Sequence, residues 1–489
     1  MSKRWSAALG GFLMYLAAGF TAAAEPPQTW APEAVRAEFD TLYEELRASH
    51  YDLYARRPKA DYDALHRAMR REFDRPLTRT QIAQRFQAFV AYGRVAHARI
   101  DAGTDAYVAF REAGGKAFPL GIRVVKGVVR VAQNESGVAD VAIGDEIVSL
   151  DGRPMDDWIK RAGRHISADT DYLLRTLLES RFAAGLWMER GTLERLALKV
   201  RKADGKVLAV SVPARSREEQ KQAVAAAKSA TSLELSWDAR EARMTPQGVA
   251  YLRPGPFYNN EPDAKDMWDA TAFVKFIDES FEGFIAANAK SVVIDLRDNP
   301  GGDNSFSDPM LAWFATKPWR FCADFRVKVS RGAVDTNAKR VPLEKDPHGA
   351  AHRFAEEYAK RKPGEVFSLE MPLVQPRQGR RFEGKVYVLI NRHSNSNTAN
   401  VAAIVQDYGF GTVLGEETAD LATTYGAMEQ FDLPRTGLTV GFPKALIVRP
   451  SGKLDTRGVV PDVALETPLP EPADDPVLHK ALAIAAVHQ

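Results

Sequence analysis

Cysteine is almost absent from this chain, because Cys322 is the only one among 489 residues. A disulfide needs two cysteines, so no internal cross-link can form, and stability must come from a packed hydrophobic core in which we expect Cys322 to lie. An excess of either charge is also absent, since 66 Lys and Arg residues stand against 64 Asp and Glu residues. Without a basic excess, nucleic acid is not an expected partner.

The apolar run at the N-terminus, Leu9 to Phe20, is short for a membrane span. Lys3 and Arg4 precede this run, and the small residues Ala22-Ala23-Ala24 follow it, as at a signal cleavage site. We therefore predict an export signal over residues 1–24, a periplasmic or secreted mature chain, and no integral membrane span in that chain. A retained membrane anchor is the alternative interpretation.

The length of the chain predicts two or three domains. Residues 25–112 carry apolar side chains at helical spacing and predict an N-terminal helical domain, whereas residues 113–215 alternate short strand patterns with turns. Residues 216–246 are rich in Ala, Lys, Gln and Glu and are typical of a linker. In residues 247–489, strand and helix patterns follow one another, which predicts an α/β core.

Two stretches within residues 113–215 resemble a PDZ-like module. They are Phe118-Pro119-Leu120-Gly121-Ile122 and the segment from Gly144 to Gly152. The resemblance implies that this region takes an extended polypeptide as an added strand. A β-rich spacer without a ligand remains the alternative.

Two strand-to-turn junctions stand out in the C-terminal half. The buried-strand pattern Val292 to Leu296 runs into Asn299-Pro300-Gly301-Gly302, a turn whose bare backbone can approach a ligand closely. The apolar run Val386 to Ile390 runs into a serine-rich turn, residues 391–399, and then a helix pattern. The free N–H groups of a helix's first turn can bind negative charge, although Ser and Asn at this position also cap helices without any chemistry.

Together these junctions resemble the core of the tail-specific, or C-terminal processing, serine peptidases and of their tricorn-core relatives. The matching blocks occur in one order along the chain: Ile294-Asp295-Leu296-Arg297-Asp298-Asn299-Pro300-Gly301-Gly302, Val388-Leu389-Ile390-Asn391 with its serine cluster, Gln406-Asp407-Tyr408-Gly409, Gly415-Glu416-Glu417-Thr418, and Arg457-Gly458-Val459-Val460-Pro461-Asp462. The resemblance implies a crotonase-like α/β peptidase core over residues 247–489. It also implies a serine peptidase that needs no cofactor and no metal.

The register of the family motif selects Ser396 as the nucleophile, flanked by Ser394 and Thr398. The amide of Asn397, with a glycine amide from Gly301 or Gly302, is then expected to form the oxyanion hole. Such donors stabilise the negative charge that develops on the substrate carbonyl oxygen.

A serine hydroxyl also needs a base. Many tail-specific peptidases use a lysine after their Gly-Glu-x-Thr motif, but Leu421 stands there in this chain, or Ala427 if a short insertion is allowed. The tricorn-core branch instead uses a histidine ahead of the PDZ-like module, and His97 in Val95-Ala96-His97-Ala98-Arg99-Ile100 falls on that position. A histidine that titrates near neutral pH can carry a proton from the serine to the leaving amine. A histidine that merely ends a helix is the alternative.

The carboxylate that orients His97 is predicted at Asp455, where the tricorn-core enzymes have a glutamate. Asp455 is also readable as a surface turn residue, and Glu429 is a second candidate. Lys444 is kept as an alternative base, with an ordinary strand-end lysine as the competing interpretation.

Other histidines suit the chemistry less well. His393 lies in the same tight turn as Ser396 and is expected to line the site rather than to act as the base. His348 and His352 have a spacing that suits a metal, but Gly349 stands where a zinc peptidase would need its glutamate, and Pro347 favours a loop.

Two functions follow from these residues. The first is an exported serine endopeptidase acting on polypeptides, and the PDZ-like resemblance implies that this region presents them to the site. The second is an inactive peptide-binding or scaffolding protein with the same fold, since Ala399 replaces a glutamate found in many relatives and Leu421 replaces the lysine.

Overall fold

The structure is a computed structural model that describes residues 28–226, 233, 235–343 and 347–487. The export signal predicted over residues 1–24 lies outside these described residues. Part of the predicted linker, residues 227–232 and 234, lies outside them as well.

The C-terminal half is built on a six-stranded sheet that is parallel apart from one edge strand. Its strands lie in the order β18 (Val463–Ala464), β15 (Thr412–Gly415), β14 (Lys385–Ile390), β11 (Ser291–Asp295), β10 (Ala250–Arg253) and β9 (Glu241–Met244). The central strands β11 and β14 are almost wholly apolar because both faces of the sheet are covered.

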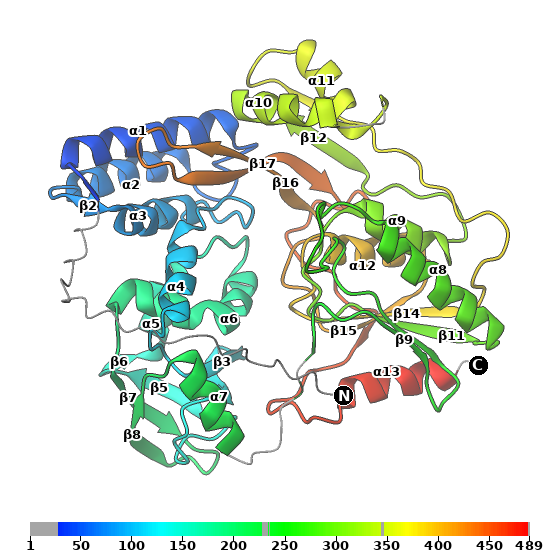
Figure 1. Cartoon of the computed structure of the whole chain (residues 1–489), viewed down its shortest axis with the longest axis horizontal. Coiled ribbons are helices and arrows are strands. Elements are labelled where there is room, and N and C mark those ends of the chain that lie inside the picture. Colours follow the sequence, from blue (N-terminus) through cyan, green and yellow to red (C-terminus); the bar gives the residue numbers. More distant parts are fainter. Residues whose placement is uncertain (1–27, 227–232, 234, 344–346, 488–489) are drawn as a thin grey trace, which may run out of the picture.

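Alternate residues of these strands face two different cores. Val292 and Val388 face a core that includes residues of α8 (Thr271–Ala286), α9 (Asn304–Ala312) and α12 (Asn397–Tyr408). Val293 and Leu389 face the helix α13 (Pro476–Val487) on the other side. This arrangement is the predicted α/β core, and the helices cover the sheet on both faces (Figure 1).

A second, antiparallel sheet adjoins this core. Its order is β13 (Val366–Ser368), β12 (Asp324–Lys328), β17 (Thr439–Val448) and β16 (Thr424–Asp432). The segment after β12 forms α10 (Arg331–Arg340), the 3-10 helix η1 (Val341–Leu343) and α11 (Ala350–Ala359). Cys322 is buried in the core of this sheet, as predicted.

The N-terminal region is helical, as predicted, and packs on the β16–β17 hairpin (Figure 1). Leu438, Val440 and Phe442 from the hairpin lie in the same hydrophobic core as Phe39 and Phe86 from the helices. The elements of this region are β1 (Thr29–Trp30), α1 (Pro32–Ser49), α2 (Lys59–Glu72), β2 (Leu77–Thr78), α3 (Arg79–Ala91) and α4 (Ala102–Glu112).

The β-rich region forms a separate antiparallel sheet with its own core. Its elements are β3 (Leu120–Val125), β4 (Val128–Asn134), β5 (Glu146–Leu150), β6 (Arg153–Pro154), α5 (Met155–Gly163), α6 (Asp171–Arg190), β7 (Arg195–Arg201) and β8 (Val207–Pro213), followed by α7 (Arg217–Ala226). In β7, buried and exposed residues alternate along the strand, so one face of this sheet packs inward and the other faces solvent.

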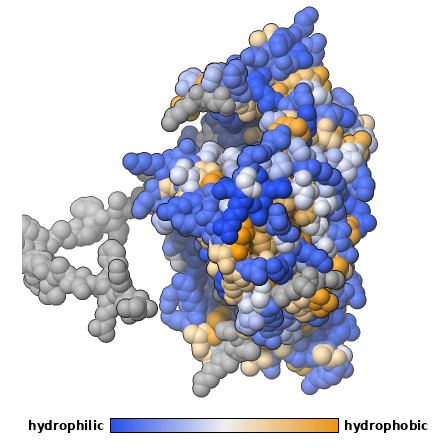
Figure 2. Space-filling model, turned by 90° about the vertical axis from the view of Figure 1, so that its right-hand side faces the viewer, coloured by the Kyte–Doolittle hydropathy of each residue, from blue (hydrophilic) through white to orange (hydrophobic). Residues whose placement is uncertain are grey.

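Across the described residues, no helix is both long enough and apolar enough to cross a membrane. On the face drawn in Figure 2, hydrophobic side chains occur in separate groups among hydrophilic ones.

Candidate active site

The glycine turn and the serine turn lie side by side, because each follows one of two adjacent parallel strands. β11 leads into the glycine turn and β14 leads into the serine turn. Hydrogen bonds join the two turns directly. The N–H of Asn395 donates to the carbonyl of Asn299 over 3.0 Å, and the Ser394 hydroxyl donates to the carbonyl of Leu296 over 2.8 Å.

Ser394 and Ser396 occupy very different environments. Ser394 is fully buried, and its Oγ also accepts from the N–H of Asn391 over 3.0 Å, so its hydroxyl is committed to the turn. Ser396 is exposed and has φ 52° and ψ −125°, a backbone conformation unfavourable for a residue with a Cβ. A strained turn between a strand and a helix is the setting in which hydrolases display a nucleophilic serine.

Gly301 must be glycine for a steric reason. Its φ is 95°, and a Cβ at this position would lie 2.7 Å from the Cβ of Ser396 and 2.9 Å from the backbone nitrogen of Asn397. The bare backbone of the glycine turn therefore packs directly against the serine turn.

The amides around Ser396 differ in their availability. The N–H of Gly301 donates to Oδ1 of Asn299 over 3.0 Å and is therefore occupied. Phe257 pairs with the glycine turn through the carbonyl of Gly301 and the N–H of Asp303, which leaves the N–H of Gly302 out of this pairing. Within the described part of the chain, the amides of Gly302 and Asn397 have no hydrogen-bond partner.

His97 lies in the turn between α3 and α4, and backbone hydrogen bonds join this turn to the C-terminal half of the chain. Two residues later, Arg99 forms a bridge with Gly441 of β17, with N–H to O distances of 3.0 and 2.8 Å in the two directions. One residue earlier, Ala96 packs against the cluster formed by Ala168, Leu173 and Ala419. The fold thus carries the His97 turn to the residue that precedes Asp420.

Asp420, the residue after Ala419, connects the region around the His97 turn to the serine turn. Its side chain is buried, and its Oδ2 accepts the backbone N–H of Ser396 over 2.6 Å, while its Oδ1 accepts that of Leu421 over 2.9 Å.

Asp169, which sequence reasoning missed, is the second buried carboxylate at this junction. It accepts the N–H of Ala96 over 3.1 Å and pairs with Arg56 over 3.1 Å. Burial raises the pKa of Asp169 and the nearby charge of Asp420 adds to this effect, while Arg56 and His97 oppose it. The only local signal, Asp169-Thr170 ahead of a helix, is one that helix caps also give.

The other sequence candidates lie in different surroundings. Asp455 is exposed, and its charge acts on Arg457. Lys444 is buried, with its Nζ 2.7 Å from Oε1 of Glu429, so these two candidates pair with each other. Burial lowers the pKa of Lys444 and the carboxylate of Glu429 opposes the shift. Nε2 of His393 lies 3.2 Å from Glu179 on α6.

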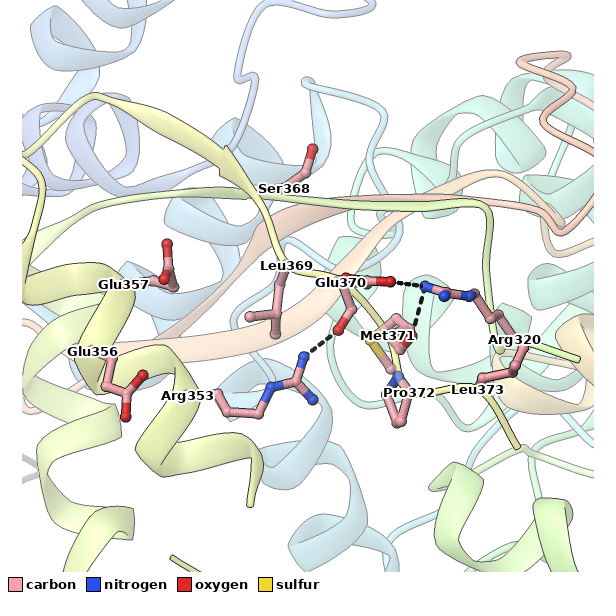
Figure 3. A pocket seen from close by; sticks show the side chains of 10 residues that line it. All are labelled: Arg320, Arg353, Glu356, Glu357, Ser368, Leu369, Glu370, Met371, Pro372 and Leu373. Carbon is pink, nitrogen blue, oxygen red and sulfur yellow. Dashed lines mark hydrogen bonds and ion pairs between the residues drawn. The ribbon is translucent and has the colours of Figure 1, made fainter. Parts of the chain in front are cut away.

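A cavity of about 550 Å³ lies apart from these residues, between α11 and the chain that follows β13 (Figure 3). Arg320 and Arg353 both donate to Glu370 along its wall, and it contains none of the residues proposed for chemistry. His348 lies in the turn before α11 and His352 lies within that helix. Among the described residues, no group of three or more His, Cys, Asp or Glu could hold a metal ion.

Comparisons with known proteins agree with this geometry. Residues 261–465, which include both turns, match peptidase family S41. The solved structure of mature CPAF complexed with lactacystin is 15% identical, with a TM-score of 0.62, and the alignment covers 93% of this chain and 97% of that one. Mature CPAF is also 15% identical, with a TM-score of 0.60 and coverage of 93% and 96%. At this identity the likeness shows the fold.

The photosystem II D1 C-terminal processing protease is 13% identical, and the alignment covers 88% of this chain and 93% of that one with a TM-score of only 0.44. Among curated proteins, none matches this sequence. The resemblance to the tail-specific serine peptidase family is thus confirmed by the family match, and the fold agrees with it. The chain contains a peptidase family S41 domain and is a serine-type peptidase with an α/β core.

Proposed function

We propose that this protein is an exported endopeptidase in which Ser396 is the nucleophile and His97 is the general base. The observation that carries the proposal is the exposed, strained Ser396 between two unpaired amides, at the junction to which the His97 turn is fastened. Export is proposed from the sequence of residues 1–24, and a mature chain beginning near Glu25 is the expected mass-spectrometric result.

In the proposed mechanism, Ser396 Oγ attacks the carbonyl carbon of a peptide bond while His97 accepts the hydroxyl proton. The carbonyl oxygen becomes an oxyanion, which accepts hydrogen bonds from the amides of Asn397 and Gly302. Gly301 contributes close approach rather than a donor, because Asn299 already accepts from its N–H. His97 then protonates the leaving amine, and water hydrolyses the acyl-enzyme by the same proton transfers in reverse order.

A fluorophosphonate that reacts with activated serines tests the nucleophile. Wild type and Ser394→Ala should be labelled, whereas Ser396→Ala and His97→Ala should not. Ser394→Ala removes a hydroxyl that only holds the two turns together, so labelling of this variant should be slowed but not abolished. Labelling of Ser396→Ala at the wild-type rate rejects Ser396 as the nucleophile. Saturable polypeptide binding by wild type without cleavage would favour the scaffolding alternative suggested by Ala399 and Leu421.

We extend the proposal to the substrate. β3 is an edge strand of the β-rich sheet, so an extended polypeptide can add along its outer side. Binding of an uncleaved polypeptide to Ser396→Ala should slow amide hydrogen exchange in β3. Protection confined to the serine and glycine turns would argue against presentation by this PDZ-like region.

A further inference from the structure

Asp169 lies where three distant parts of the chain meet. It follows the α5 helix, accepts the backbone N–H of Ala96 from the His97 turn, and pairs with Arg56 from the loop after α1. The Asp169 side chain has no exposed surface, and 18% of the Arg56 side chain is exposed. A buried carboxylate with a cationic partner and a backbone donor is held in one orientation, and these two partners oppose the rise in pKa that burial causes.

The hydrogen-bond capacity of Asp169 is only partly used. One oxygen accepts from Arg56 and the other from Ala96, whereas an ionised carboxylate offers about four acceptor sites. Asp169 is close to His97 in the fold because it accepts the N–H of Ala96, the residue directly before His97. Among the described residues, Nδ1 of His97 is buried without a hydrogen-bond partner. A histidine base needs a partner at that nitrogen so that its other nitrogen faces the serine.

The two neighbouring acids are engaged differently. Asp420 has its two oxygens on the N–H groups of Ser396 and Leu421, so it supports the serine turn rather than the imidazole. Asp455 is exposed and acts on Arg457.

We propose that Asp169, rather than Asp455, is the carboxylate that positions His97. The proposal rests on the proposed roles of Ser396 and His97. In the substrate complex Asp169 accepts a hydrogen bond from the Nδ1–H of the imidazole, which fixes the tautomer whose Nε2 accepts a hydrogen bond from the Ser396 hydroxyl. Unliganded sites of this kind often have loose hydrogen bonds that tighten in the substrate complex.

The test compares Asp169→Asn with Asp455→Asn in the full chain, with cleavage of an unstructured polypeptide and fluorophosphonate labelling as readouts. Asp169→Asn should lower kcat by about 10²- to 10⁴-fold and change KM by less than about three-fold, because the amide favours the wrong tautomer. Asp455→Asn should stay within about three-fold of wild type. The acid limb of the pH–rate profile should move to lower pH in Asp169→Asn, since the carboxylate that favours the protonated ring is gone. The other charged groups near Asp169, which are Arg56 and Asp420, are present in both wild type and Asp169→Asn.

Wild-type kcat and an unmoved profile in Asp169→Asn, with the loss in Asp455→Asn instead, overturn the inference. If Asp169→Asn does not fold, ¹⁵N-histidine NMR of wild type with a bound, non-cleavable peptide replaces it, because the proposed hydrogen bond forms in the substrate complex. A low-field Nδ1 proton that disappears in His97→Ala and persists in Asp455→Asn supports Asp169, and its loss in Asp455→Asn contradicts it. Failure of wild type to react with the serine probe is a separate result, because it rejects the proposed function itself.

Discussion

The backbone N–H of Ser396 donates to Oδ2 of the buried Asp420 over 2.6 Å, so a fixed negative charge holds the residue with the unfavourable φ of 52° in place. A hydrogen bond to a charged acceptor is worth about 1.5–3 kcal/mol.

Asp420→Ala should lower the free energy of unfolding by about that amount and slow fluorophosphonate labelling by about ten-fold or more. Asp420→Asn keeps an acceptor oxygen and should lose less. Asp432→Ala removes an exposed carboxylate from β16 and serves as the control. An unchanged labelling rate in a folded Asp420→Ala protein would show that this bond does not position the serine.

Gly301→Ala should damage the site more than it damages the fold. The added Cβ meets the Cβ of Ser396 at 2.7 Å, and a φ of 95° is strained for alanine. We expect about a hundred-fold slower labelling and a loss of about 1–3 kcal/mol in the free energy of unfolding. Gly283→Ala, on the exposed side of α8 with nothing near its Cβ, should instead stabilise the protein by about 0.5–1 kcal/mol. Equal labelling of the two variants would contradict the close packing of the two turns.

Asp308 on α9 should make stability depend on pH. Burial raises the pKa of this carboxyl from its ordinary value of 3.8 to about 6. The folded protein therefore binds the proton of Asp308 more tightly than the unfolded chain does. The stability that this proton contributes is fully present below about pH 4 and is lost as pH rises through about 6. As pH rises from 4 to 7.5, the free energy of unfolding of Asp308→Asn should increase by roughly 2–3 kcal/mol relative to that of wild type. Urea unfolding at both pH values measures the difference, and an equal offset at both would refute this explanation.

Lys444→Met tests whether the buried pair with Glu429 is structural. Removing one partner leaves a buried charge, which costs about 3–5 kcal/mol. Arg340 also pairs with Glu429 and should keep the loss near the lower end of that range. Labelling per folded molecule should stay at the wild-type rate, and its loss would restore Lys444 as a candidate base. Lys275→Met breaks an exposed pair with Glu279 and should cost less than about 1 kcal/mol.

The sequence predicts those parts of the fold and site whose information is local. The apolar strand over residues 292–296 and its glycine turn are contiguous, and so are residues 386–390 and the serine turn. Their adjacency follows because parallel strands place their following turns at one edge of the sheet. Residues 331–340 carry little apolar patterning for an equally local reason, since only Ala333 and Asn337 are buried in α10.

The junction around His97 could not be predicted in the same way. The contact between Ala96 and Asp169 spans 73 residues, and the bridge between Arg99 and Gly441 spans most of the chain. No sequence pattern at any of these four residues indicates which residue it contacts. The family resemblance predicts His97 as the base from its local motif, whereas Asp169 lies beside this turn only because distant segments pack together.

The hairpin of β16 and β17 completes the hydrophobic core of the first helices, which gives synthesis of this protein a fixed order. α1 and α3 cannot complete the burial of their apolar faces until Leu438, Val440 and Phe442 have been translated. A nascent or C-terminally truncated chain therefore has no settled place for its histidine. The position of the His97 turn therefore depends on segments from both ends of the described chain.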